Sequence, residues 1–196
     1  ASPEVWLNAN GTGGNGAIGG NGGIGRGGTA SVANPGSLSV PATLQIAASG
    51  IGGTATGSGT GGSAFGGTAG ITTAGNLTVP GALLVGANAT TGTGVNTGNA
   101  TGGAVQLVQD GGTATIGGLL EMGASGTVSA GTVRGDGTGG TVLLDVNAGS
   151  LDVTGSSTLS AIGSGRIADA GAITLNTDGN IRLRGFLEMQ GGAVSS

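Results

Sequence analysis

The side chains that could take part in catalysis are few, and their types exclude most kinds of active site. The 196-residue chain has no cysteine and no histidine, which excludes Ser–His and Cys–His nucleophiles and thiolate metal sites. Nine carboxylates remain, and two pairs of them flank turns: Asp145 with Asp152, and Asp169 with Asp178. A polysaccharide-cleaving site would need such a pair to converge, but aspartate at a turn usually serves the turn itself. We therefore expect no enzyme, no catalytic residue and no cofactor.

One glycine-rich stretch contains a candidate receptor-binding motif. Arg134, Gly135 and Asp136 form an Arg-Gly-Asp tripeptide, whose aspartate could bind the metal ion of an integrin-type receptor. The overlapping Gly135-Asp136-Gly137 is similar to part of a calcium-binding repeat, but the tandem nonapeptide of such repeats is absent. We interpret it as a solvated turn and expect no metal site in the chain.

Asparagine and threonine supply two further candidate sites. Four Asn-x-Thr sequons are candidate glycosylation sites: Asn10, Asn76, Asn88 and Asn99. Thr-x-Thr occurs at Thr54/Thr56 and at Thr113/Thr115, and an ice-binding surface would need one such pair in every coil. These pairs are too few for that function.

The composition indicates a narrow, repetitive core. Fifty residues are glycine, three are aromatic and 7% are charged, and the apolar residues occur in short aliphatic runs. So little charge argues against disorder. The net charge of −4, with five scattered arginines and no lysine, gives no electrostatic basis for binding nucleic acid. No apolar run is long enough for a transmembrane helix.

A short motif of alternating polar and aliphatic residues recurs five times and predicts the fold class. Counted from Leu38, its copies follow at steps of 39, 37, 37 and 30 residues, and a small residue ends each one. Regular steps of this length are typical of a solenoid. We predict an all-β protein with a parallel β-helix (β-solenoid) architecture. The five copies begin at Ser37, Asn76, Thr113, Ser150 and Asn180.

Each repeat contains two further aliphatic runs that predict strands. One follows the motif, as at Leu44-Gln45-Ile46, and another precedes the later copies, as at Val105-Gln106-Leu107-Val108. If one coil takes roughly 18 to 20 residues, each unit makes two coils and the chain about ten. Ten coils would form a rod on the order of 50 Å long.

The N-terminal part of the sequence differs from the rest, so we predict two regions. Residues 1–30 would form an N-terminal cap, with Trp6 covering the open end of the core, and a glycine-rich tract; residues 31–196 would form the solenoid repeats. From Gly13 to Gly28, glycine occurs at every third position. This period fits either close-packed polyproline II chains or tight corners of the same solenoid.

The style of the repeats resembles a family of secreted bacterial proteins. The strings that begin at Ala148 and Ala172 are similar to β-helix passengers of filamentous-haemagglutinin-like exoproteins and autotransporter adhesins, over most of residues 31–196. The resemblance implies a right-handed β-helix, export to the surface of a Gram-negative cell, and attachment to a receptor or glycan. We therefore expect an extracellular, non-catalytic structural or adhesive solenoid.

Two alternative functions remain open on the sequence. Low charge and the absence of lysine would not prevent end-to-end or side-by-side association, so the chain could be a subunit of a fibre or surface layer. A polysaccharide-binding or polysaccharide-cleaving β-helix is the second alternative, although few aromatic residues are available to stack on sugars.

Overall fold

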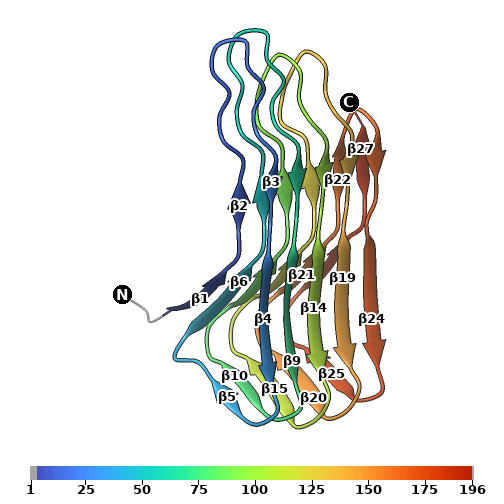
Figure 1. Ribbon diagram of the computed structural model, residues 1–196. Coiled ribbons are helices and arrows are strands. Elements are labelled where there is room, and N and C mark those ends of the chain that lie inside the picture. The colour runs from blue at the N-terminus through green and yellow to red at the C-terminus, as the bar shows by residue number, and fades with distance from the viewer. Residues whose placement is uncertain (1–3, 196) are drawn as a thin grey trace.

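The protein is a parallel β-solenoid. The computed structural model describes residues 4–195, which contain 27 strands and no helix. Every strand pairing among these residues is parallel, and each strand pairs with strands one coil before or after it. Five sheets result, here called sheets I to V in the order in which the chain passes through them (Figure 1). The all-β class and the β-helix architecture are confirmed; the right-handed coil stays a prediction.

Sheets I and II contain six strands each, and sheets III to V contain five. Sheet I comprises β1 (Glu4–Asn8), β6 (Thr43–Ala47), β11 (Leu83–Gly86), β16 (Leu120–Gly123), β21 (Ser157–Ser160) and β26 (Leu187–Gln190). Sheet II comprises β2 (Gly11–Thr12), β7 (Gly50–Ile51), β12 (Ala89–Thr90), β17 (Gly126–Thr127), β22 (Gly163–Gly165) and β27 (Ala193–Ser195). Sheet III comprises β3 (Gly25–Arg26), β8 (Ala64–Phe65), β13 (Ala100–Thr101), β18 (Gly137–Thr138) and β23 (Ala168–Asp169).

The remaining two sheets follow the same order. Sheet IV comprises β4 (Thr29–Asn34), β9 (Thr68–Thr73), β14 (Ala104–Gln109), β19 (Thr141–Val146) and β24 (Ala172–Thr177). Sheet V comprises β5 (Leu38–Ser39), β10 (Leu77–Val79), β15 (Thr113–Ile116), β20 (Ser150–Val153) and β25 (Asn180–Leu183).

The predicted coil length is wrong: one repeat unit makes one coil, not two. Leu44 pairs directly with Leu83, and Leu83 pairs with Leu120, so that a full repeat of 39 or 37 residues separates neighbouring strands. Residues 4–195 therefore make five coils and part of a sixth, instead of ten coils. At about 4.8 Å between strands, the six strands of sheet I span roughly 24 Å, half the predicted rod.

The hydrophobic core lies between sheets I, IV and V, which have the longer strands. Sheets I, IV and V enclose the lower part of the molecule in Figure 1, and alternate residues of their strands point inward. Leu83 of sheet I, Ile71 of sheet IV and Leu77 of sheet V are fully buried. The alternation predicted from the repeated motif thus determines which face of each strand meets the core.

Above this core the two sides of each coil come into direct backbone contact, in a region here called the waist. In all five coils a glycine N–H just before sheet IV donates across the interior to an alanine carbonyl just after sheet I, with N···O distances of 2.6 to 2.8 Å. A Cβ on Gly103 would lie 2.0 Å from the carbonyl oxygen of Gly67, so no other side chain fits. The five pairs are Gly28–Ala9, Gly67–Ala48, Gly103–Ala87, Gly140–Ala124 and Gly171–Ala161.

Beyond the waist, sheets II and III continue into thin two-layered loops, here called the tips. A zigzag of backbone hydrogen bonds connects the two layers: Gly23 donates to Gly14, Gly53 to Gly23 and Gly62 to Gly53. In the first tip the period-three glycines each donate an N–H to the second coil, at 2.8 to 3.0 Å, from Gly13, Gly16, Gly19, Gly22 and Gly25. These bonds to the next coil place the tract within the solenoid, and a polyproline II conformation of its backbone stays a prediction. The domain boundary at residue 30 stays a prediction.

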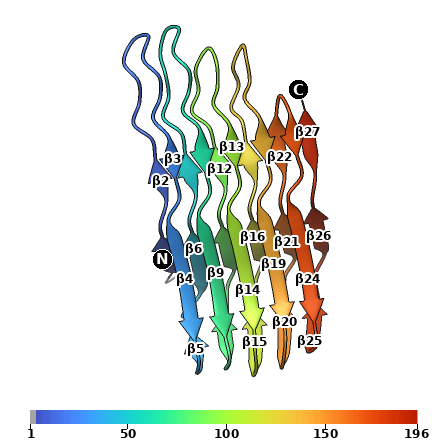
Figure 2. The same cartoon turned by 45° about the vertical axis from the view of Figure 1, so that its right-hand side comes forward.

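The length of the tip explains why the repeat shortens along the chain. The tips comprise residues 13–24, 52–63, 91–99, 128–136 and 166–167, and Figure 2 shows them becoming shorter towards the C-terminus. The step is 37 residues at the pair Gly126–Gly163 in sheet II and 31 at Gly137–Ala168 in sheet III, so the shorter last tip accounts for six of the seven residues lost. The turn between sheets IV and V accounts for the seventh, since the step is 31 at Val146–Thr177 and 30 at Ser150–Asn180.

Trp6 does not cover the end of the core, contrary to the prediction. Val5 and Leu7 on β1 pack against the core, and Trp6 between them points outward with 60% of its surface exposed. Its indole Nε1–H donates to Glu4 Oε2 at 2.8 Å. Strand alternation therefore places this ring on the outer face of sheet I.

Replacing a waist glycine tests whether backbone contact is required there. We expect Gly103→Ala to lower the free energy of unfolding by about 2–3 kcal/mol, because its Cβ would overlap a carbonyl oxygen that sheet pairing holds in place. The matched control is Gly86→Ala in sheet I, whose Cβ would have Asn88 Nδ2 as its nearest neighbour at 3.6 Å. Urea unfolding should leave the control within about 0.5 kcal/mol of the parent. Equal effects of the two variants would refute a special role for the waist.

Candidate functional site

A column of polar side chains extends the backbone ladder at the corner between sheets I and II. Asn10 Oδ1 accepts the N–H of Ser49 at 2.7 Å, Ser49 Oγ accepts that of Asn88 at 3.3 Å, and Asn88 Oδ1 accepts that of Ser125 at 2.8 Å. Ser125 Oγ continues the column to the N–H of Ile162. Each side-chain oxygen satisfies a backbone donor at a corner where the chain leaves its strand.

All four sequon asparagines have this same structural function. Asn76 Oδ1 accepts the N–H of Thr113, and Asn99 Oδ1 accepts that of Asp136, both at 2.9 Å. The four asparagines are exposed, and glycosylation would modify Nδ2 and leave the accepting Oδ1 in place. The geometry is therefore compatible with glycosylation, which stays a prediction.

The Arg-Gly-Asp tripeptide belongs to a second column of this kind. Ser63 Oγ accepts the N–H of Asn99, Asn99 accepts that of Asp136, and Asp136 Oδ1 accepts that of Ile167 at 3.3 Å. The same Asp136 oxygen pairs with Arg166 Nη2 at 2.9 Å.

The other two members of the tripeptide are also bonded within the protein. Arg134 Nη2 donates to the carbonyl of Val128 at 2.8 Å, and the N–H of Gly135 donates to Thr97 Oγ1 at 3.1 Å. A receptor would have to compete with these bonds and with the Arg166 ion pair for Asp136. Receptor binding through Arg134, Gly135 and Asp136 stays a prediction.

The two aspartate pairs at turns lie on separate outer surfaces. Asp145 is on β19 of sheet IV and Asp152 on β20 of sheet V, while Asp169 is on β23 and Asp178 follows β24. Asp152 accepts a hydrogen bond from Arg184 Nε at 2.8 Å and a second from Nη2. This side-chain hydrogen bond lowers the pKa of Asp152 and raises the pKa of Arg184. Its geometry is that of an arginine–carboxylate fork between two coils.

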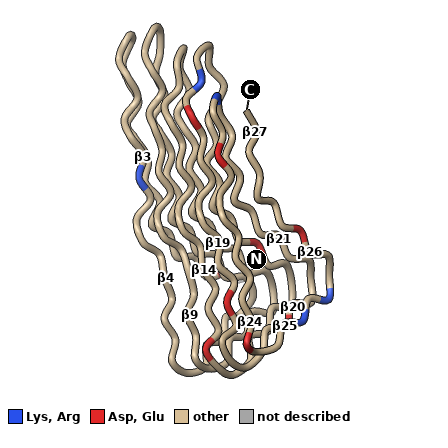
Figure 3. The backbone as a smooth tube through the Cα atoms, turned by 90° about the vertical axis from the view of Figure 1, so that its right-hand side faces the viewer, with Lys and Arg blue, Asp and Glu red and all other residues tan. Residues whose placement is uncertain are grey.

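Charged side chains do not gather into a metal site in the part of the chain that the structure describes. Within residues 4–195, no three acidic side chains come together in a way that could hold a metal ion. Figure 3 shows the charges spread along the coils, with most of the chain uncharged. The pair Thr113/Thr115 is on β15, where the outward neighbours of Thr115 on either side are Thr78 and Asp152, so threonine does not continue across sheet V.

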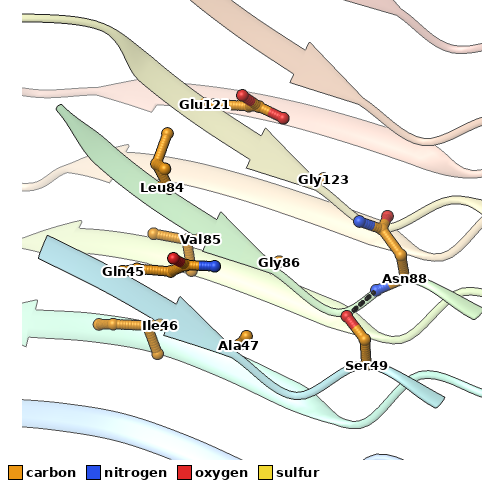
Figure 4. Close-up of a pocket in the computed structure, with 10 residues that line it drawn as sticks. All are labelled: Gln45, Ile46, Ala47, Ser49, Leu84, Val85, Gly86, Asn88, Glu121 and Gly123. Atoms are coloured by element: carbon orange, nitrogen blue, oxygen red, sulfur yellow. Dashed lines mark hydrogen bonds between the residues drawn. The ribbon is translucent and has the colours of Figure 1, made fainter. Parts of the chain in front are cut away.

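A shallow groove lies on the outer face of sheet I. It has a volume of about 170 Å³ and spans three coils, from β6 through β11 to β16 (Figure 4). Its floor contains the paired small residues Ala47, Gly86 and Gly123, which leave space because neighbouring columns have longer side chains. The lining residues are Gln45, Ile46, Ala47, Ser49, Leu84, Val85, Gly86, Asn88, Glu121 and Gly123.

The two walls of this groove differ in chemistry. One wall is the outward column Gln45, Leu84 and Glu121, and the other comprises Ser49 and Asn88 of the corner column. Sequence reasoning did not find this groove. A signal was present, since Ala47, Gly86 and Gly123 follow at the repeat steps of 39 and 37 residues.

Comparison with protein-family models, curated proteins and solved structures finds no match for this chain. The structure also has no helix within residues 4–195 that is long and apolar enough to cross a membrane.

Asp136 can be substituted in two ways that separate its ladder hydrogen bond from its charge. We expect Asp136→Asn to cost less than about 1 kcal/mol, because an amide oxygen can accept the N–H of Ile167, as Asn99 does one coil earlier, and only an exposed ion pair is lost. Asp136→Leu also removes the acceptor and should cost about 0.5–1.5 kcal/mol more than Asp136→Asn. Urea unfolding measures both variants, and equal losses would rule out the ladder role.

The Asp152–Arg184 pair should make stability depend on pH. The pKa of Asp152 is lowered in the folded state, so its contribution is present above the unfolded value of about 3.9 and is lost as pH falls through the folded value. At pH 7 we expect the Asp152→Asn variant to have a lower urea midpoint of unfolding than the parent protein. Near pH 2 the two midpoints should be equal. Asp145→Asn, which makes the same substitution on neighbouring sheet IV, is the matched control. A gap that is constant with pH would contradict this assignment.

Proposed function

We propose that the chain is a non-catalytic structural and adhesive β-solenoid of an extracellular bacterial surface protein. The observation that carries this proposal is that all five sheets continue from coil to coil in register, so that outward side chains form continuous columns along the axis. Such a surface suits a ligand that is itself extended and repetitive. The parallel coil is also the architecture implied by the resemblance to filamentous-haemagglutinin-like and autotransporter adhesins.

Backbone bonding supports the structural part of the proposal. Interior N–H groups bond to the adjacent coil or across the waist, and the corner columns supply side-chain acceptors where the sheets end. A coil bonded in this way needs no large apolar core to remain ordered, which is how so glycine-rich a chain can form a rigid shaft.

The groove on sheet I is the proposed adhesive site, and its ligand class is an extended glycan. Gln45 and Asn88 provide amide donors and acceptors, and Glu121 provides a carboxylate, the groups that bind sugar hydroxyls. Its length runs along the solenoid axis, where successive coils about 4.8 Å apart present Gln45, Leu84 and Glu121. A glycan lying along the axis would thus meet an amide, an aliphatic and an acidic side chain in turn.

Cleavage of the glycan is a second candidate, favoured by one observation. Glu121 and Glu188 lie in the same outward column of sheet I, separated by Thr158. Two coil spacings amount to roughly 9–10 Å, near the upper limit for the two carboxyl groups of an inverting glycosidase. The binding experiment should therefore be accompanied by an assay for reducing ends.

Filling the groove tests the adhesive site. We expect Gly86→Gln to weaken glycan binding at least tenfold, because its side chain would occupy the floor of the groove without displacing backbone. The measurement is a glycan-array screen of the 196-residue chain, followed by calorimetric titration of the best ligand. Gly36→Gln is the matched control, since a Cβ there has nothing within 4 Å and the residue lies outside the groove.

Three outcomes decide between the candidates. Loss of binding in Gly86→Gln alone supports the groove, and equal binding by both variants rejects it. If the protein releases reducing ends from the glycan, and Glu121→Gln abolishes this release, cleavage would replace adhesion as the function. Attachment to cells that is lost in Asp136→Asn, with the fold intact, would move the adhesive site to the Arg-Gly-Asp tripeptide.

A further inference from the structure

The outer face of sheet I carries acidic side chains and, among the residues that the structure describes, no basic ones. Glu4, Glu121 and Glu188 point outward from β1, β16 and β26. The five arginines lie elsewhere: Arg26 on β3 of sheet III, Arg134 and Arg166 in two tips, Arg182 on β25 and Arg184 just after it. Arg184, which the chain reaches shortly before β26, is already bonded to Asp152. An anionic ligand on this face would therefore meet like charge.

The carboxylate that lines the groove differs from the other two on this face. Glu4 Oε2 accepts the indole N–H of Trp6, and Glu188 Oε1 accepts an N–H from Gln190. Glu121 accepts no such bond within residues 4–195 and forms no ion pair there. Its side chain is exposed, so both of its oxygens can accept hydrogen bonds from a ligand in the groove.

The amide groups of the groove add neutral hydrogen-bonding positions to this negative charge. Asn88 Oδ1 accepts the N–H of Ser125, whereas Asn88 Nδ2 would lie 3.6 Å from a Cβ on Gly86, over the floor of the groove. Neither this Nδ2 nor the amide of Gln45 is hydrogen-bonded within residues 4–195. The groove thus combines one carboxylate with amides that can bind hydroxyl groups.

The single tryptophan of the chain lies in the same outward column as this carboxylate. Trp6 pairs with Gln45 in the register of sheet I, one coil before the groove, and the column continues through Leu84 to Glu121. Strand alternation directs the ring outward, and its face offers an apolar surface on which a sugar ring can stack. Three coil spacings, roughly 14 Å, separate Trp6 from Glu121.

We propose that the groove binds an extended glycan with free amino groups, which places one ammonium group against Glu121 and one sugar ring against Trp6. This inference rests on the proposed adhesive function and names the ligand of the same groove more closely. An ammonium group donates a charge-assisted hydrogen bond to the carboxylate, an N-acetyl group donates a neutral one, and a sulfate group would be repelled. A basic peptide has the same charge but lacks the ring hydroxyls that Gln45 and Asn88 would bind.

Two linear glucosamine oligosaccharides of equal length, one with free amines and one fully N-acetylated, test the role of charge. Titration at low salt can be followed by the fluorescence of Trp6, the only tryptophan. We expect the free amine to bind about three- to tenfold more tightly than the N-acetylated form. Glu121→Gln and high salt should each remove this preference. Asp145→Asn, which removes one carboxylate from sheet IV, should keep it.

Trp6→Leu tests the stacking contact separately from the charge. We expect this variant to bind both oligosaccharides about threefold or more weakly, with the preference for the free amine unchanged, because stacking does not involve the amine. Calorimetric titration measures this variant, which has no tryptophan. Phe186→Leu is the matched control, since it removes an exposed aromatic ring that lies outside the groove, and it should bind like the parent. Equal binding by Trp6→Leu and the parent would overturn the stacking contact.

The outcomes separate this inference from the adhesive site itself. If Gly86→Gln leaves the binding of both oligosaccharides unchanged, the groove is not the site and both proposals fail. If Gly86→Gln abolishes binding but the N-acetylated or a sulfated form binds as tightly as the free amine, the groove stands and the amine assignment fails. If neither oligosaccharide binds, the amine assignment fails, and the glycan array still decides whether the groove is adhesive. Equal affinity for a lysine peptide with the same number of amines would overturn a glycan as the ligand.

Discussion

Direct contact between facing backbones is the constraint on which the rest of this structure depends. At the waist a glycine N–H from one side of each coil reaches an alanine carbonyl on the other side, with no side chain between them. This contact closes the apolar core below it and aligns the two layers of the tip above it. The glycine content therefore reflects a packing requirement, since a Cβ at most of these positions would overlap a carbonyl oxygen.

Side-chain oxygens at the corners add hydrogen bonds to this backbone packing. Their structural function accounts for several residues that the sequence indicates as candidate functional sites. The sequon asparagines and Asp136 each accept a backbone N–H from the next coil, and serine or threonine performs the same task elsewhere. Equivalent corner positions in successive coils carry Asn, Ser or Asp. Each of these side chains places an oxygen where it can accept the N–H of the next coil. Short sequence motifs at such corners therefore arise from the requirements of the fold.

The sequence was sufficient to predict sheets I, IV and V, because their strands bury alternate aliphatic residues and so leave a period-two signal. Sheets II and III were missed, since their strands are mostly two residues long and face each other through glycine. That omission also caused the error in coil length: with three of five strands visible, 37 residues seemed enough for two coils. Part of the candidate site was equally hidden, because the groove is defined by small residues, which carry no chemical motif.

The hydrogen bonds between coils run along the solenoid axis, and residues 4 and 195 belong to opposite ends of the stack (Figure 2). A pulling force applied at residues 4 and 195 would consequently act on the hydrogen bonds of one terminal coil at a time. These bonds would break coil by coil, and the bonds of all coils would not break together. Each released coil of 37 residues would add about 120–130 Å of contour length. A shaft of this kind yields in steps and dissipates a pulling force over distance, while the coils that remain stacked keep their surface columns intact.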